Sequence, residues 1–111
     1  MIRRLAALSL LLVATAAAAQ QPSLAERQRL AALGSALGRC HHGIVLREAP
    51  GRLTAAQIAD RAIAACASHE APIRAELTRQ IGPQRTIGVL QAQRQHWRQA
   101  IAQMVTQTRG H

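Results

Sequence analysis

The sequence predicts an all-α protein, either a small three-helix bundle or a helical hairpin followed by a long C-terminal helix. Two observations predict this fold class. Along three segments the apolar residues recur at spacings of three and four, which places them on one face of a helix. Nowhere in the chain do apolar and polar residues alternate as they do in a half-buried strand.

Residues 1–19 have the organisation of an export signal. Two arginines give a positive start, an apolar stretch follows, and Ala17-Ala18-Ala19 before Gln20 supplies the small residues that signal peptidase requires. The alternative is an uncleaved anchor, but the apolar stretch falls short of the roughly 20 residues that span a bilayer. We therefore expect cleavage after Ala19, a single helical domain over residues 20–111, and no transmembrane segment in the mature form.

The first helix is predicted over residues 23–48. Ser23 and Glu26 have the spacing of a capping box, in which each side chain binds the backbone N–H of the other residue. Gly34 and Gly38 lie one turn apart, so we expect another helix to approach closely there. The apolar face predicted for this helix consists of Leu30, Leu33, Leu37, Cys40 and Ile44.

The second helix is predicted over residues 54–81, where Thr54 and Gln57 form another capping box. Two interpretations of its middle stay open. Ser68 could cap a new helix with Pro72 in its first turn, where a missing N–H costs little, or a single kinked helix could continue through both residues. The apolar face begins with Ile58, Ala62, Ile63 and Cys66.

The third helix is predicted over residues 84–108 and is the most regular of the three. Its apolar stripe is interrupted by Arg94. Trp97, the only aromatic residue of the chain, lies on this stripe, so we expect it in the core; the alternative is a residue that stacks on bases or sits at a membrane interface. The stripe consists of Ile87, Leu90, Trp97, Ile101, Met104, Val105 and Thr108.

The two cysteines predict a disulfide between Cys40 and Cys66. An exported chain with an even number of cysteines is typical of disulfide bonding. Both residues lie on apolar faces and at equal distances along the chain from Leu53, so they face each other in an antiparallel helical hairpin. The chain-entropy argument gives such a bond about 3.5 kcal/mol of stabilisation.

A metal site is the alternative for the cysteines. Cys40, His41, Cys66 and His69 are the thiolates and imidazoles that zinc or copper would bind. However, adjacent residues on a helix point about 100° apart, which separates His41 from Cys40, and thiolates oxidise outside the cytoplasm. We therefore expect no metal and no cofactor, and we expect the histidines on the solvated helix surface.

Arginine supplies all 14 basic side chains, against five acids. Without residues 1–19 the chain keeps 12 arginines and a net charge of +7. This surplus could serve an anionic partner, whereas GC-rich codon usage would give the same composition without any partner. Because the arginines are dispersed and no aromatic residues interleave with them, we expect no specific nucleic-acid binding and only weak binding to anionic envelope components.

The segment Leu53-Thr54-Ala55-Ala56-Gln57 resembles the L-T-x-x-Q signature of periplasmic stress chaperones of the Spy and CpxP type. That resemblance covers five residues and implies an exported, basic, all-helical chaperone that forms a dimeric cradle. The two cysteines and the Ala-rich stretch before Cys66 make the mature chain similar to small exported two-cysteine helical proteins of alphaproteobacteria. This second resemblance implies no particular function.

The sequence contains no constellation of residues typical of catalysis. Its five acids are spread out, each with an arginine a few residues away as a surface partner, and its Ser and Thr residues mostly occupy caps. We therefore expect no enzyme, but a small non-enzymatic protein of the periplasm or the secreted fraction. The alternatives are a chaperone-like or scaffold binding protein, including a homodimer, and an envelope-anion binder.

Overall fold

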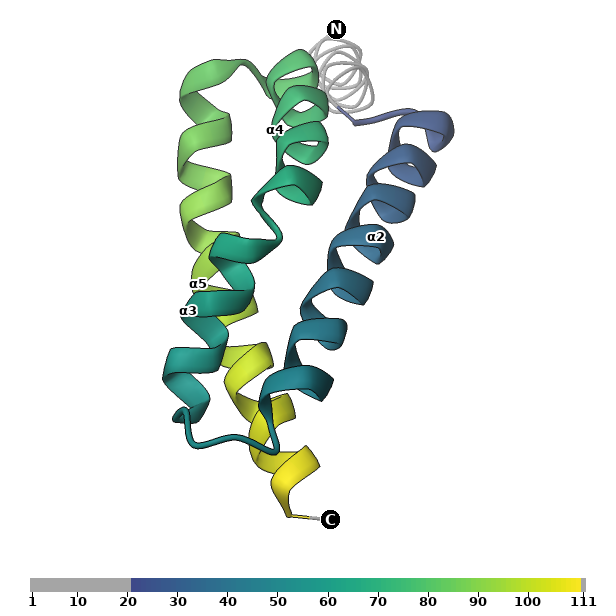
Figure 1. The fold of residues 1–111 in the computed structure, drawn as a ribbon. Helices are drawn as coiled ribbons and strands as arrows, with labels where there is room; N and C mark the ends of the chain where they lie inside the picture. Colours follow the sequence, from purple (N-terminus) through teal and green to yellow (C-terminus); the bar gives the residue numbers. More distant parts are fainter. Residues whose placement is uncertain (1–20, 111) are drawn as a thin grey trace, which may run out of the picture.

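The computed structural model describes residues 21–110, which form four α-helices and no strand. They are arranged as three antiparallel rods, with α3 and α4 placed end to end as the middle rod (Figure 1). The all-α prediction is therefore confirmed, whereas the export signal predicted over residues 1–19 lies outside the described residues. The helices are α2 (Leu24–Glu48), α3 (Ala55–Ala65), α4 (Ala67–Ile81) and α5 (Pro83–Arg109).

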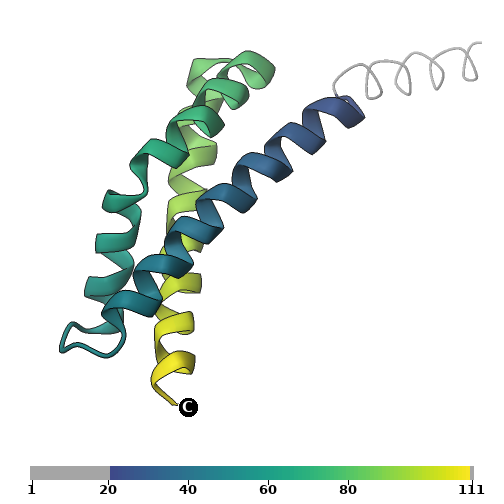
Figure 2. The same cartoon turned by 45° about the vertical axis from the view of Figure 1, so that its right-hand side comes forward.

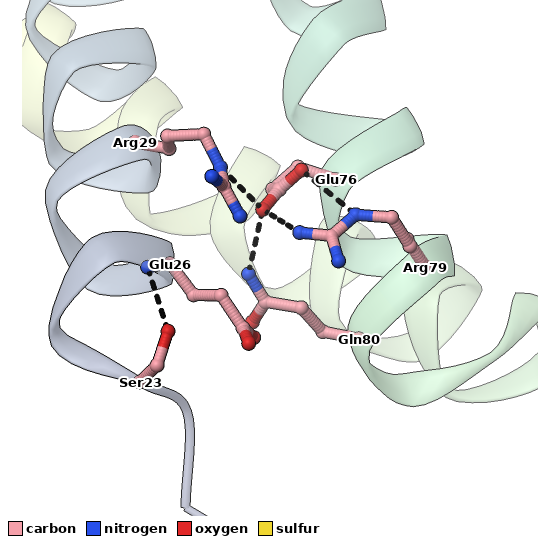
Figure 3. A network of polar contacts seen from close by, with 6 residues as sticks. All are labelled: Ser23, Glu26, Arg29, Glu76, Arg79 and Gln80. Atoms are coloured by element: carbon pink, nitrogen blue, oxygen red, sulfur yellow. Dashed lines mark hydrogen bonds and ion pairs between the residues drawn. The ribbon is translucent and has the colours of Figure 1, made fainter.

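Capping interactions fix where α2 and α3 begin. At α3 the capping box is complete: the Gln57 N–H donates to Thr54 Oγ1 at 3.1 Å, and the Thr54 N–H donates to Gln57 Oε1 at 2.9 Å. At α2 the Glu26 N–H donates to Ser23 Oγ at 3.1 Å. The Glu26 side chain extends toward α4 instead of returning to the backbone of Ser23 (Figure 3).

The middle rod breaks at Cys66, which separates α3 from α4. Cys66 has φ −97° and ψ 14°, and its carbonyl accepts hydrogen bonds from the N–H groups of both His69 and Glu70. No side chain caps α4, so the predicted role of Ser68 as a cap is wrong. Pro72 lies beyond the first turn, inside α4. Neither interpretation holds in full: a new helix begins, but at Ala67 and without a Ser68 cap, and the bend between α3 and α4 precedes the proline.

A glycine turn folds α5 back along α4. Gly82 has φ +83°, a conformation that residues with a Cβ rarely adopt, and Pro83 begins the next helix. The hydroxyl of buried Thr86 donates to the Gly82 carbonyl at 2.8 Å. These features hold the two helices as an antiparallel hairpin.

The hydrophobic core lies where the C-terminal halves of α2 and α5 meet α3. Figure 2 shows α2 inclined to the other rods, with its C-terminal half closest to them. The predicted apolar faces agree with this core except at Ile87, which is 56% exposed, and at Thr108, which is also exposed. The apolar residues that are at most 2% exposed are Val45, Ile58, Ala59, Ala62, Cys66, Ile101 and Val105.

A further prediction concerns Gly34 and Gly38 of α2. A Cβ built at Gly34 or Gly38 would have no atom within 4 Å, so the expected close helix approach there is wrong. These glycines face open space because the packed side of α2 is the one that carries Leu37 and Ile44.

None of the helices in residues 24–109 is both long and apolar enough to cross a bilayer.

The last turn of α5 closes the opposite end of the bundle. The Arg109 guanidinium donates hydrogen bonds to the carbonyls of Ala49, Gly51 and Leu53, at 2.9, 3.4 and 2.5 Å. All three acceptors belong to the connection between α2 and α3. This one side chain therefore attaches the connection to the end of the third rod.

The two cysteines lie at disulfide distance. Their Sγ atoms are 2.10 Å apart, and their Cα atoms are 5.9 Å apart, which is within the range that a bridge spans without backbone movement. Cys66 is fully buried at the bend of the middle rod, and Cys40 lies on α2. The pair therefore connects the first rod to the bend in the second.

We predict that the double variant Cys40→Ala/Cys66→Ala is less stable than the oxidised protein by about 2–5 kcal/mol, because the unfolded chain is no longer constrained. Urea denaturation followed by circular dichroism measures this difference. The control is the wild-type protein after reduction, which should match the variant. A variant as stable as the unreduced wild type would show that the pair does not stabilise the fold.

Candidate functional site

A buried carboxylate connects α4 and α5. The side chain of Glu70 is only 6% exposed, and its Oε1 accepts hydrogen bonds from Nε and Nη2 of Arg94, the former at 2.8 Å. Arg74, one turn further along α4, approaches the same oxygen at 3.4 Å. Two guanidinium groups and one carboxylate therefore share a site with a local excess of one positive charge.

A pocket of about 320 Å³ lies beside this cluster, between the two helices of the hairpin. Its walls combine the two arginines with apolar and hydroxyl-bearing side chains. The lining residues are Arg74 and Thr78 from α4, with Pro83, Thr86, Ile87, Leu90, Gln91 and Arg94 from the turn and α5.

The pocket is polarised along its length. Because α4 and α5 are antiparallel, Arg74 lies opposite Arg94, while Thr78 lies near Pro83 at the turn. The Thr78 hydroxyl donates to the Arg74 carbonyl at 2.7 Å, so its proton is directed to its own helix. The end nearer the turn is therefore mainly apolar, and the far end carries the guanidinium groups.

Ile87 explains why this pocket exists. It continues the apolar stripe of α5 but is 56% exposed, whereas Leu90 in the next turn is 3% exposed. In this turn of α5 the buried side chain is that of Thr86, which is 2% exposed, so Ile87 lies at the edge of the contact with α4. Arg94, which interrupts the stripe in the sequence, does so because it neutralises Glu70.

A second polar cluster joins the N-terminal part of α2 to the end of α4 (Figure 3). Glu76 accepts hydrogen bonds from Arg29 on α2, from Arg79 and from Gln80. The hydrogen bonds from Arg79, then Gln80, lower the pKa of Glu76 to about 2. The carboxylate is satisfied by its own neighbours, so this cluster attaches one rod to another and offers no group for acid–base chemistry.

The burial of His41 differs from the sequence prediction. His41 is 5% exposed, not on the solvated surface, and its ring lies 6.0 Å from the ring of half-buried Trp97 at an interplanar angle of 58°. Burial lowers the pKa of His41, although the nearby Glu70 carboxylate opposes this shift. The ring therefore packs in the core in its neutral form near pH 7.

The structure separates the residues considered for a metal site. Cys40 and Cys66 lie against each other, His41 packs on Trp97, and His69 is exposed on α4. Among residues 21–110, no three or more Cys, His, Asp or Glu side chains come together in a way that would hold a metal ion.

The arginine-bordered pocket was not found from the sequence. Glu70 was predicted to be a surface acid with an arginine a few residues away, whereas its main partner is Arg94, on another helix. The available indication was the single charge that interrupts an otherwise apolar stripe at this position. Comparisons with protein-family models, with curated proteins and with solved structures found no match for this chain.

We predict that acidification destabilises the protein through His41. Its folded pKa lies below the unfolded value of 6.5, so the stabilisation is present above pH 6.5 and is lost as the pH falls through the folded pKa. Melting temperatures between about pH 7.5 and about pH 5 test this. His41→Gln should flatten the profile, whereas the exposed control His69→Gln should keep the wild-type slope; equal slopes in all three proteins would contradict the prediction.

We predict that Arg94→Met destabilises the protein by about 2 kcal/mol, because it leaves the buried Glu70 carboxylate with only the longer contact to Arg74. The double variant Glu70→Leu/Arg94→Met should recover most of that loss, since it removes both charges. The matched control Arg98→Met breaks the exposed pair with Asp60 and should cost less than about 1 kcal/mol. Urea denaturation measures all three; equal losses in the two single variants would contradict the assignment.

Proposed function

We propose that this protein is exported to the periplasm or secreted, and that it is a non-enzymatic binding protein for anionic components of the cell envelope. The observation that carries the proposal is the distribution of its arginines. Within residues 21–110, five of them have no Asp or Glu carboxylate oxygen within 4.0 Å: Arg27, Arg39, Arg52, Arg85 and Arg109. Of these, Arg109 donates to backbone carbonyls instead. The positive surplus is therefore held at the surface, where an anionic ligand can reach it.

The cysteine pair supports export. Disulfides persist in oxidising compartments and are rare in the cytoplasm. Cys40 and Cys66 lie at bonding distance in the core, and the described residues include no other cysteine. A small core without Phe or Tyr gains more from such a bond than a large one does.

The geometry favours an anion-binding role over a chaperone-like one. A chaperone for unfolded chains needs a contiguous exposed apolar surface. The large apolar side chains exposed in the described residues are separated, at the two ends of α2 and in the first two turns of α5: Leu24, Leu46, Ile87 and Val89. Half-buried Trp97 offers no platform for stacking bases, which argues equally against specific nucleic-acid binding.

We predict that the protein recovered from the envelope fraction begins at Gln20. Intact mass and N-terminal sequencing measure this. The control is a variant with Ala17→Arg and Ala19→Arg, which replaces the small residues that signal peptidase requires and should accumulate uncleaved. A mature protein that retains residues 1–19 would contradict the export proposal.

We predict that the mature protein binds vesicles containing phosphatidylglycerol and not vesicles of phosphatidylcholine alone. Binding should be released as salt rises to a few tenths molar, where the Debye length falls well below about 8 Å. Replacing Arg27, Arg39, Arg52 and Arg85 by Gln should weaken binding and reduce its salt dependence. Duplex DNA of unrelated sequences and heparin should compete comparably; a preference of about a hundredfold for one DNA sequence at physiological salt would contradict the proposal.

A further inference from the structure

We propose that the pocket between α4 and α5 binds a single-chain amphiphile with one negative charge in its head group. The head group would lie against Arg74 and the tail against Ile87 and Leu90. This inference rests on the proposed function in taking an anion as the ligand. It adds to that function a defined site and a ligand class. General attraction between dispersed arginines and an anionic surface requires neither.

The charge of the pocket selects a monoanion. Arg94 is committed to Glu70 through two of its nitrogens. Arg74 makes a single contact with the same carboxylate, at 3.4 Å, and its side chain is 52% exposed. Its other guanidinium donors can turn to a second anion without leaving Glu70 unpaired. With two arginines and one glutamate at this end, one further negative charge makes the cluster neutral.

The apolar end of the pocket selects a tail. Leu90 forms a buried floor, and Ile87 stands exposed beside it. The hydroxyls of Thr78 and Thr86 both donate to backbone carbonyls, at 2.7 and 2.8 Å, so neither directs its proton into the pocket. A hydrocarbon chain would cover Ile87 and remove its side chain from water, which is the main favourable term for such a contact.

The size of the pocket selects one chain of moderate length. Its volume of about 320 Å³ is near the lower limit for ligand pockets, so a lipid with two long chains does not fit. The helix from Pro83 to Arg94 spans about 16 Å at 1.5 Å per residue. That distance accommodates an extended chain of medium length with its head group beside the arginines.

The test is an NMR titration of the mature protein with octanoate, read from the backbone amides of Thr78, Leu90 and Gln91. Three probes are matched to it: acetate lacks the tail, octan-1-ol lacks the charge, and octyltrimethylammonium reverses the charge. We expect octanoate alone to shift these amides saturably. Shifts of equal size with octanol would overturn the assignment of the head group, and equal shifts with acetate would overturn that of the tail.

Four variants locate the site. Arg74→Gln and Ile87→Gln should each weaken octanoate binding by about fivefold or more. Arg61→Gln on α3 and Val89→Gln on α5, which change exposed residues outside the pocket, should stay within about twofold of wild type. Thermal melting of each variant shows that the fold is retained. Equal weakening by all four would overturn the proposal in favour of general charge attraction.

The outcome separates this inference from the proposed function. A protein that binds phosphatidylglycerol vesicles but gives no shifts with octanoate would overturn the pocket and leave the envelope-binding role in place. Octanoate binding without vesicle binding would support the pocket and contradict the broader role. If neither ligand binds, both proposals fail.

Discussion

The contact between Cys40 and Cys66 is the one on which the other packing depends. The chain has one aromatic residue and no Phe or Tyr, so its core is built from Val, Ile, Leu and Ala side chains that each cover little area. The cysteine pair fixes α2 against the middle rod where that rod bends. Toward the α2–α3 connection the core fills with Ile58 and Ala62; toward the α4–α5 turn, polar groups take part of its place.

Those polar groups differ in what they contribute. The cluster at Glu76 is formed by arginines that are more than half exposed, and exposed ion pairs add little to stability. The cluster at Glu70 is different, because the Glu70 side chain is more than nine-tenths buried. A carboxylate buried to this extent needs the charge of Arg94 to compensate its own. The same buried pair holds a guanidinium at the rim of an apolar pocket, so a structural requirement of the hairpin also creates the most distinctive chemical feature of the surface.

The helices were predictable from local rules, and the site was not. Capping residues such as Thr54 and the periodicity of apolar residues depend on neighbours in sequence, so they predicted three rods and most of the core. The break at Cys66, the burial of His41 and the partnership of Glu70 with Arg94 depend on which helix faces lie together in space. Spacing along the chain carries no direct information about those partners. For the same reason, the exposure of Ile87 could not be predicted.

The three carbonyl contacts of Arg109 have a consequence for the order in which the chain can complete its fold. The connection between α2 and α3 is synthesised before α5, but the side chain that secures it lies 56 to 60 residues further along the chain. The packing of α3 against α5 likewise waits for α5. A chain that has not yet reached α5 therefore lacks the contacts that close the bundle.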